Sequence, residues 1–216
     1  MSNLSLSQEY LMCALNGKGK IPTFSFERII AVAASAVVDL MMDDIIESDG
    51  KKLSIKKALP SEKSYLSPVY DFIEKKEPVG FKTVVEHFSV TFTSKNIDEL
   101  VDSIGGSLVS AGCAQKEKRG MFGNKNAYIP DAKSVDSVIQ NIRAEILEDG
   151  ALSEDIAALT AILNKTGELM RFFSAYEKKD VKKRLKEIKE NPENKEIAKV
   201  INYVEELMVI IVVSAT

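Results

Sequence analysis

The sequence predicts a mainly α-helical protein: a single helical domain over residues 1–216, built around a central apolar helix, with two small β-hairpins. Three observations support this fold class. Apolar residues recur at helical intervals along most of the chain, as in amphipathic helices. The stretch 29–38 is nearly all apolar and rich in small residues, which indicates a helix buried on most sides. Two short segments, 45–55 and 113–129, have strand character around glycines, which predicts hairpins.

The first half of the chain begins with two helices. Ser5-Leu6-Ser7-Gln8 has the spacing of a capping box, in which serine and glutamine side chains bond backbone amides at a helix start. A loop with two glycines then leads into the central helix. The expected elements are the central helix at about 24–42, a hairpin around Asp49-Gly50, and short helices at about 68–76 and 81–88.

The second half contains a helix, a basic hairpin and a series of further helices. Asn96-Ile97-Asp98-Glu99 fits a second capping box and predicts a helix from there to about residue 112. Residues 113–118 and 125–129 are expected to form the two arms of a projecting hairpin. A long helix should run from Ser134 to a stop at Gly150. The remaining helices are expected at 153–164, 167–177, 180–189 and 193–213.

The hairpin is the most informative feature for function. Its segment 115–125 carries four cations against one anion, and two glycines bracket Met121 and Phe122 at its centre. Apolar side chains at a tip with positive charge around them suit an anionic membrane or a partner subunit. An ordinary solvated basic turn is the alternative reading. The four cations are Lys116, Lys118, Arg119 and Lys125.

Two further basic segments are weaker candidates. Gly17-Lys18-Gly19-Lys20 could receive a phosphate through its lysines and glycine-freed amides, although it lacks the spacing of a phosphate-binding loop. A flexible connector is the simpler reading of that segment. The run 178–186 is also basic, but its apolar residues have helical spacing. That spacing indicates the charged outer face of an amphipathic helix.

Catalysis and metal binding find little support in the sequence, so we expect no enzyme activity and no cofactor. The single histidine, His87, has no nucleophile motif to work with, and no Cys/His cluster suggests a metal site. Cys13 and Cys113 lie far apart in apolar surroundings, as expected of reduced core residues in a cytosolic protein. The net charge of −3 opposes attraction of the whole molecule to nucleic acid or anionic lipid, so such binding would need a local basic patch.

Several segments together resemble the Golgi phosphoprotein 3 family. They are the apolar run Ile30–Leu40 with its Val-Val-Asp-Leu ending, the helix end Ser107–Gly112 before the hairpin, Asn191-Pro192-Glu193, and the closing Glu205-Glu206-Leu207. The similarity runs nearly end to end and suggests a divergent or prokaryotic member. It implies a peripheral membrane protein of the kind that recognises phosphatidylinositol 4-phosphate on Golgi membranes and retains glycosyltransferases there.

The resemblance also implies a lipid-headgroup pocket. The family uses a tryptophan before the central helix, an arginine within it, and two cationic residues on the helix before the hairpin. The corresponding positions here are Phe24, Ala33, Asp98 and Val101, of which only Phe24 keeps an aromatic face. A small shift of this register would bring Arg28 or Lys95 nearer to the pocket. The family pocket is therefore largely not retained.

These observations lead to one functional hypothesis and two alternatives. The first is a non-enzymatic peripheral membrane or adaptor protein that binds an anionic surface or phosphoinositide-type headgroup. The alternatives are a winged-helix-like nucleic-acid binder, disfavoured by acidic residues on helix 96–112, and a homo-oligomeric interaction module that uses the hairpin. No secretion signal is evident, and the longest apolar run, Leu207–Val213, is too short to span a bilayer. We therefore expect a cytoplasmic protein at the cytosolic face of a membrane.

Overall fold

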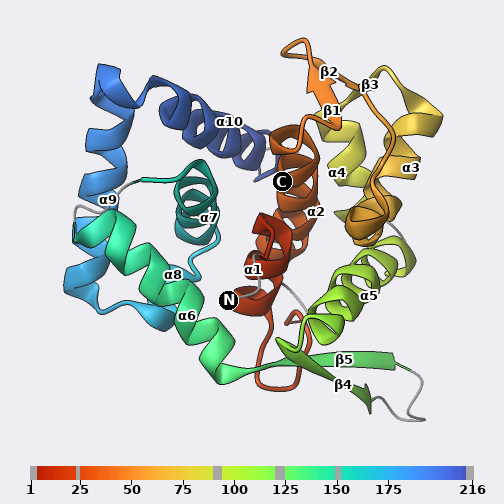
Figure 1. The fold of residues 1–216 in the computed structure, drawn as a ribbon, viewed down its shortest axis with the longest axis horizontal. Coiled ribbons are helices and arrows are strands. Elements are labelled where there is room, and N and C mark those ends of the chain that lie inside the picture. Colours follow the sequence, from red (N-terminus) through yellow and green to blue (C-terminus); the bar gives the residue numbers. More distant parts are fainter. Residues whose placement is uncertain (1–3, 23–24, 90–93, 120–124, 149–151, 213–216) are drawn as a thin grey trace.

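The computed structural model describes residues 4–22, 25–89, 94–119, 125–148 and 152–212. These residues are mostly helical, with two small antiparallel sheets (Figure 1). The predicted fold class is thus confirmed. Within the described part of the chain, no helix is both long and apolar enough to cross a membrane.

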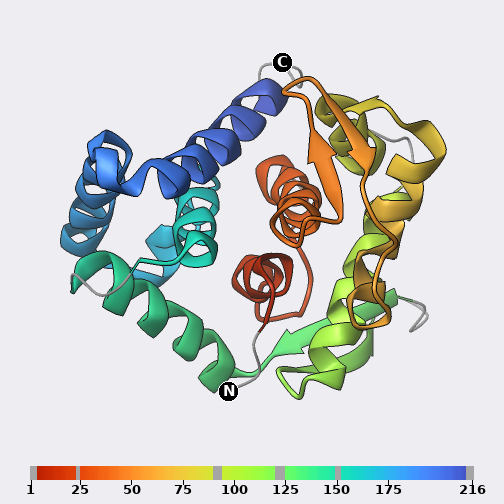
Figure 2. The ribbon, with the colours of Figure 1, turned by 45° about the horizontal axis from the view of Figure 1, so that its top comes forward.

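Two helices lie at the centre and the others surround them (Figure 2). The central pair is α1 (Leu6–Ala14) and α2 (Phe26–Met42), which pack against each other. On one side stand α3 (Ser67–Lys76), α4 (Phe81–Ser89) and α5 (Lys95–Ser110). On the other side stand α6 (Ala132–Ile142), α7 (Glu154–Lys165), α8 (Leu169–Phe172), α9 (Ala175–Glu190) and α10 (Lys195–Val212).

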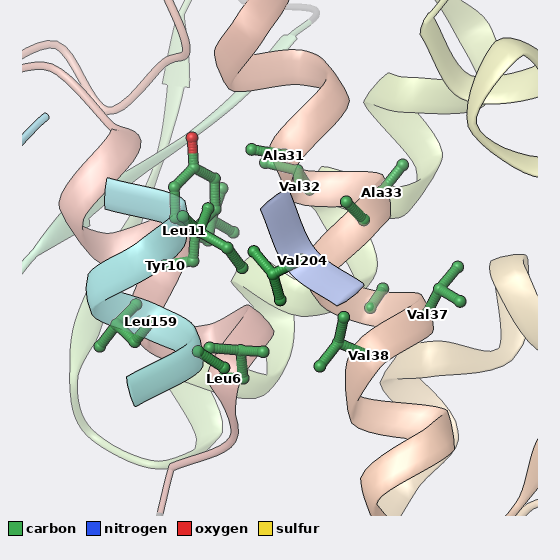
Figure 3. Close-up of a cluster of buried hydrophobic side chains, with 14 of the residues drawn as sticks. Leu6, Tyr10, Leu11, Ala31, Val32, Ala33, Val37, Val38, Leu159 and Val204 are labelled. Carbon is green, nitrogen blue, oxygen red and sulfur yellow. The ribbon is translucent and has the colours of Figure 1, made fainter. Parts of the chain in front are cut away.

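The central helix α2 is buried along an unbroken run, Ile30–Leu40. Its alanines leave room for neighbouring helices to approach closely. Figure 3 shows side chains of α1, α2, α7 and α10 meeting in the core between them. Each large apolar side chain buried in this way stabilises the fold by about 1.5–3 kcal/mol. The prediction of a central apolar helix is confirmed, with its described start at Phe26 rather than residue 24.

The predicted 45–55 hairpin is present and gains a third strand. Strand β1 (Ile46–Ser48) pairs antiparallel with β2 (Lys52–Ile55), and Gly50 in the turn has φ +90°. Strand β3 (Val79–Gly80) adds to β2. Two residues are too few to show an alternating pattern, which is why the sequence did not predict this strand.

The basic hairpin forms, with each arm within one residue of its predicted bounds. Strand β4 (Ala114–Arg119) pairs antiparallel with β5 (Lys125–Pro130), so that Lys116 lies opposite Tyr128 and Arg119 opposite Lys125. Figure 1 shows this pair at the opposite end of the molecule from the β1–β2 turn. The tip residues Met121 and Phe122 lie outside the described residues, as does Phe24.

Several predicted helix boundaries were wrong, because side chains near them form other hydrogen bonds than the sequence suggested. Helix α5 begins at Lys95 after Ser94, since the Asn96 side chain donates to the carbonyl of His87 (2.8 Å) instead of capping. Helix α9 is continuous from Ala175, where Ser174 forms a capping box with Glu177. Helix α6 begins at Ala132, capped by Asp131, and ends in a π-helical turn at Arg143–Leu147.

Helix α1 begins at a buried carboxylate that belongs to α2. The predicted capping box is present, with the Ser5 amide donating to Gln8 Oε1 (2.9 Å). Asp39 then accepts the amides of Leu6 and Ser7, both at 3.0 Å, and the Ser5 hydroxyl at 2.8 Å. Asp39 is only 5% exposed, and burial raises its pKa to about 6 against the lowering effect of these hydrogen bonds. Above that pH its negative charge complements the positive end of the α1 dipole.

Replacing Asp39 should therefore destabilise the fold. The Asp39→Ala variant leaves two buried amides of the α1 N-terminus without an acceptor, and we expect a loss of about 2–4 kcal/mol in unfolding free energy. Guanidinium denaturation followed by circular dichroism measures this loss. The matched control is Asp136→Ala, at an exposed position on α6, which should change stability by less than about 0.5 kcal/mol. Equal stabilities of the two variants would contradict the claim that Asp39 stabilises the fold by capping α1.

An acid of α1 itself, Glu9, is held in an unfavourable environment. Burial is the main cause that raises its pKa to about 7, and the charges of Asp155, Asp39 and Glu145 raise it further. An acid whose folded pKa exceeds its unfolded value destabilises the fold when it is ionised. The penalty is absent below the unfolded pKa of 4.5, grows as pH rises, and is complete above about 7.

Neutralising Glu9 should stabilise the protein only at the higher pH values. We expect Glu9→Gln to exceed wild type by about 1–3 kcal/mol at pH 8, with the difference disappearing as pH falls toward 4.5. Urea denaturation of both proteins across this pH range measures the difference. A constant offset between the two curves would show that the charge of Glu9 is not the cause.

Candidate functional site

The loop between α1 and α2 forms a compact turn that carries two lysines. Asn16 Oδ1 accepts the amides of Lys18 (2.9 Å) and Lys20 (3.3 Å), and the Asn16 carbonyl accepts the amide of Gly19 (2.8 Å). These three amides are therefore satisfied inside the loop. An anion that approached here would meet the side chains of Lys18, which is exposed, and Lys20, which is half-buried.

This loop lies directly against the basic hairpin. The amide of Tyr128 on β5 donates to the carbonyl of Gly19 (2.9 Å). Gly19 has φ +68°, and a Cβ at this position would lie 2.7 Å from both the Tyr128 carbonyl oxygen and Ile129 Cδ1. Only glycine fits such a close approach. Two basic segments about a hundred residues apart in sequence are thus brought side by side.

The four predicted hairpin cations have different surroundings. Lys116 Nζ lies 5.7 Å from the centroid of the Tyr128 ring, a cation–π distance. Arg119 pairs with Glu117 (2.7 Å) and Lys125 pairs with Asp98 (3.3 Å). Lys118 is exposed and has no ion pair to another described residue. Exposed ion pairs contribute at most about 1 kcal/mol, so these cations can exchange their partners for an external anion.

Helix α5 holds the hairpin from its other side. Asn126 Nδ2 donates to Asp102 Oδ2 (2.8 Å), and the Tyr128 hydroxyl donates to the Asp102 carbonyl (3.2 Å). A Cβ on Gly105 would lie 2.6 Å from the Tyr128 ring, so the ring rests on the α5 backbone. The hairpin base is therefore fixed, and we call the set formed with the adjoining loop the loop–hairpin surface. Its cations are Lys18, Lys20, Lys116, Lys118, Arg119 and Lys125.

Arg28 lies in a largely buried charge network at the C-terminal end of α1, where the basic loop begins. It forms an ion pair with Glu168, which is 1% exposed, and Glu168 also pairs with Arg171 (2.7 Å). Arg171 donates to the carbonyls of Cys13 (2.5 Å) and Leu15 (3.0 Å), and Arg28 reaches that of Ala14 (3.5 Å). These guanidinium groups satisfy the last carbonyls of α1 and complement its negative end. Arg28 is thus committed to an internal partner.

The positions that the resemblance assigns to the family pocket present no cation. Ala33 is fully buried in the core, Asp98 pairs with Lys125, and Val101 is half-buried. Phe24 lies outside the described residues. The described positions therefore lack the converging donors that a phosphomonoester requires.

Two polar grooves among the described residues lie elsewhere, and both include carboxylates. One, of about 410 Å³, lies between α5 and the 3-10 turn Ser61–Leu66, and an adjoining one of about 370 Å³ shares Gln8, Glu62 and Tyr65 with it. The single lysine of the second groove, Lys63, pairs with Asp43 (2.6 Å). The carboxylates in these grooves would repel a phosphate.

His87 has a packing role in this structure. Its ring stacks on that of Phe72 with centroids 3.9 Å apart, and its Nδ1 lies 3.5 Å from Asn96 Nδ2. Burial is the main cause that lowers its pKa. Among the described residues, no group of three or more histidine, cysteine or acidic side chains is placed to hold a metal ion.

These features define a mostly helical protein with a buried α1–α2 pair and a basic loop joined to a basic hairpin. The family model of Golgi phosphoprotein 3 (GPP34) matches residues 6–204, nearly the whole chain. The chain belongs to this family. A search of curated proteins finds no match.

Sequence reasoning missed Tyr128, Asn126, Glu168 and Arg171 as residues that organise this site. Each acts through partners at least 24 positions away, except for the local Glu168–Arg171 pair. The one available signal was that a glutamate and an arginine stand three residues apart in a largely apolar stretch. That spacing alone does not distinguish a surface pair from a buried one.

Removing Glu168 should leave two partly buried guanidinium groups without their shared carboxylate. We expect Glu168→Ala to lower the melting temperature by roughly 6–20 °C, because breaking a buried pair costs about 3–5 kcal/mol. Calorimetry measures the shift. Glu206→Ala, at an exposed position on α10, is the control and should melt within a few degrees of wild type. A Glu168→Ala protein that melts like this control would contradict the network.

Proposed function

We propose that the protein is a non-enzymatic peripheral membrane adaptor that binds anionic membranes through its loop–hairpin surface. The observation that carries this proposal is the hydrogen bond from the Tyr128 amide to the Gly19 carbonyl. It joins the lysines of the loop to those of the hairpin, so that one membrane surface can meet both. Family membership supports the same role, since the family takes its name from a protein of the Golgi, which is a membrane compartment.

The charges of this surface supply a useful affinity only when they act together. Each cation near an anionic membrane contributes about 1 kcal/mol, so a hairpin with two uncommitted lysines binds weakly by itself. Adding Lys18 and Lys20 brings the total to about 4 kcal/mol, roughly a thousandfold in partition. If Met121 and Phe122 at the tip enter the interface, their burial adds about 2–4 kcal/mol before entropic costs.

The preferred lipid follows from the same geometry. Because the described pocket positions offer no converging cations, we propose that the surface selects membranes by charge density rather than by one headgroup in a closed site. Phosphoinositides would then bind as highly charged lipids, at the cytosolic face of a membrane. The remaining faces of the molecule would be available to client proteins.

Nucleic acid is a poorer partner for this surface. Helix α5, which would take the place of a recognition helix, carries Asp98 and Asp102 next to the hairpin. Glu99 is exposed on the same helix. These carboxylates would confront backbone phosphates, and few arginines are near to read base edges.

The proposal predicts a specific pattern in vesicle flotation. With phosphatidylcholine vesicles that contain phosphatidylserine, we expect Lys18→Ala/Lys20→Ala and Lys116→Ala/Lys118→Ala each to weaken binding roughly 10- to 30-fold at low salt. The control is Lys51→Ala/Lys52→Ala, an exposed pair on the β1–β2 hairpin at the opposite end of the molecule (Figure 1). It should bind like wild type.

Two results would overturn this proposal. One is that wild type fails to float with anionic vesicles at low salt, and the other is that the control pair loses as much binding as the two test pairs. Light scattering of the same samples separates the alternative in which the hairpin contacts a second copy of the chain. In that case the hairpin variants would lose mass, and their weaker flotation would follow from lost avidity.

A further inference from the structure

We propose that Tyr128 and Gly19 form a positioning joint that sets the loop lysines and the hairpin lysines at one fixed relative placement, so that they bind an anionic surface as a unit. This inference rests on the proposed function and adds a mechanism to it. A basic surface assembled from two separate segments binds tightly only if both segments reach the membrane together. Preorganisation of the two segments removes the entropic penalty of aligning them at the moment of binding.

The first part of the joint is the contact between loop and strand. Tyr128 is 1% exposed although it belongs to a two-stranded hairpin, because the loop covers one side of it and α5 the other. Its amide points away from β4 and donates to the Gly19 carbonyl (2.9 Å). The close approach at Gly19 leaves no space for a side chain, so loop and strand are in direct backbone contact.

The second part is the contact between strand and helix. The Tyr128 ring lies against Gly105, and its hydroxyl donates to the Asp102 carbonyl. Helix α5 thus provides a rigid base for the joint, reinforced by the bond from Asn126 to Asp102. One residue therefore connects three elements: the basic loop, the basic hairpin and a core helix.

The third part links the joint to the charges themselves. Lys116 lies opposite Tyr128 in the strand register, and its ammonium lies over the same ring. Lys18 and Lys20 flank Gly19, the other partner of Tyr128. A shift of the loop relative to β5 would therefore move the loop lysines away from Lys116 without changing any charge.

The test moves the loop and keeps every charge. Gly19→Ala introduces a Cβ into the tightest contact at a positive φ, so it should push the loop off β5. The control, Gly17→Ala, lies in the same loop, where a Cβ would meet nothing within 4 Å. Both are measured by flotation with phosphatidylcholine–phosphatidylserine vesicles, alone and combined with Lys18→Ala/Lys20→Ala. Circular dichroism checks that each variant stays folded.

The expected result is a loss of coupling. Gly19→Ala should weaken vesicle binding by about three- to tenfold, approaching the loss caused by removing the loop lysines themselves. Adding Lys18→Ala/Lys20→Ala to Gly19→Ala should then cause only about threefold further loss, whereas it should cause its full loss in the Gly17→Ala background. A change in stability alone would not produce this non-additivity.

The remaining outcomes overturn the inference in distinguishable ways. If wild type binds and Gly19→Ala binds equally well, or if its loss adds fully to that of the lysine pair, the joint does not position the charges and the proposed function still stands. If wild type does not bind anionic vesicles, the proposed function fails and this inference fails with it.

Discussion

The structure depends on the burial of a short helix whose two ends are neutralised by charges from distant parts of the chain. Helix α1 is only nine residues long, too short to be stable alone in water. Asp39 of α2 accepts its first amides, and Arg28 and Arg171 meet its last carbonyls with Glu168 between them. Without these partners, a helix in the centre of the molecule would leave several backbone groups unsatisfied.

This arrangement also fixes the place of the basic loop. The loop begins where the guanidinium of Arg171 holds the carbonyls of Cys13 and Leu15, so its first residues are anchored to the core. Asn16 then closes the turn, and Gly19 meets the hairpin. Contacts therefore run without a break from the buried Glu168 to the loop that carries Lys18 and Lys20. The position of the loop lysines on the surface thus depends on contacts in the core.

Much of the fold could be predicted from the sequence, because helical periodicity and glycine turns are local signals. The central apolar helix, the capping box at Ser5 and both hairpins follow from such signals, and the structure has them. The predicted helix boundaries were less accurate where a side chain expected to cap a helix forms a different hydrogen bond. Asn96, for example, donates to the His87 carbonyl. The two-residue strand β3 and the π-helical turn after α6 leave no local pattern.

The candidate site could be predicted only in part, since its residues meet through long-range contacts. The cations of the hairpin and loop are visible in the sequence, but nothing there indicates that Tyr128 joins the two segments. Arg28 shows the reverse case, in which a cation that the sequence offers as a binding residue pairs with a buried glutamate instead. Composition gives the charge of a side chain, and only the fold gives its partner.

Hydrogen–deuterium exchange with and without anionic vesicles tests the central claim most directly. The account predicts that vesicles slow amide exchange in both the loop 16–20 and the strands β4 and β5, while the β1–β2 hairpin stays unchanged. Protection of the hairpin without the loop, or protection centred on the basic helix α9, would contradict the claim that loop and hairpin form one membrane-binding surface.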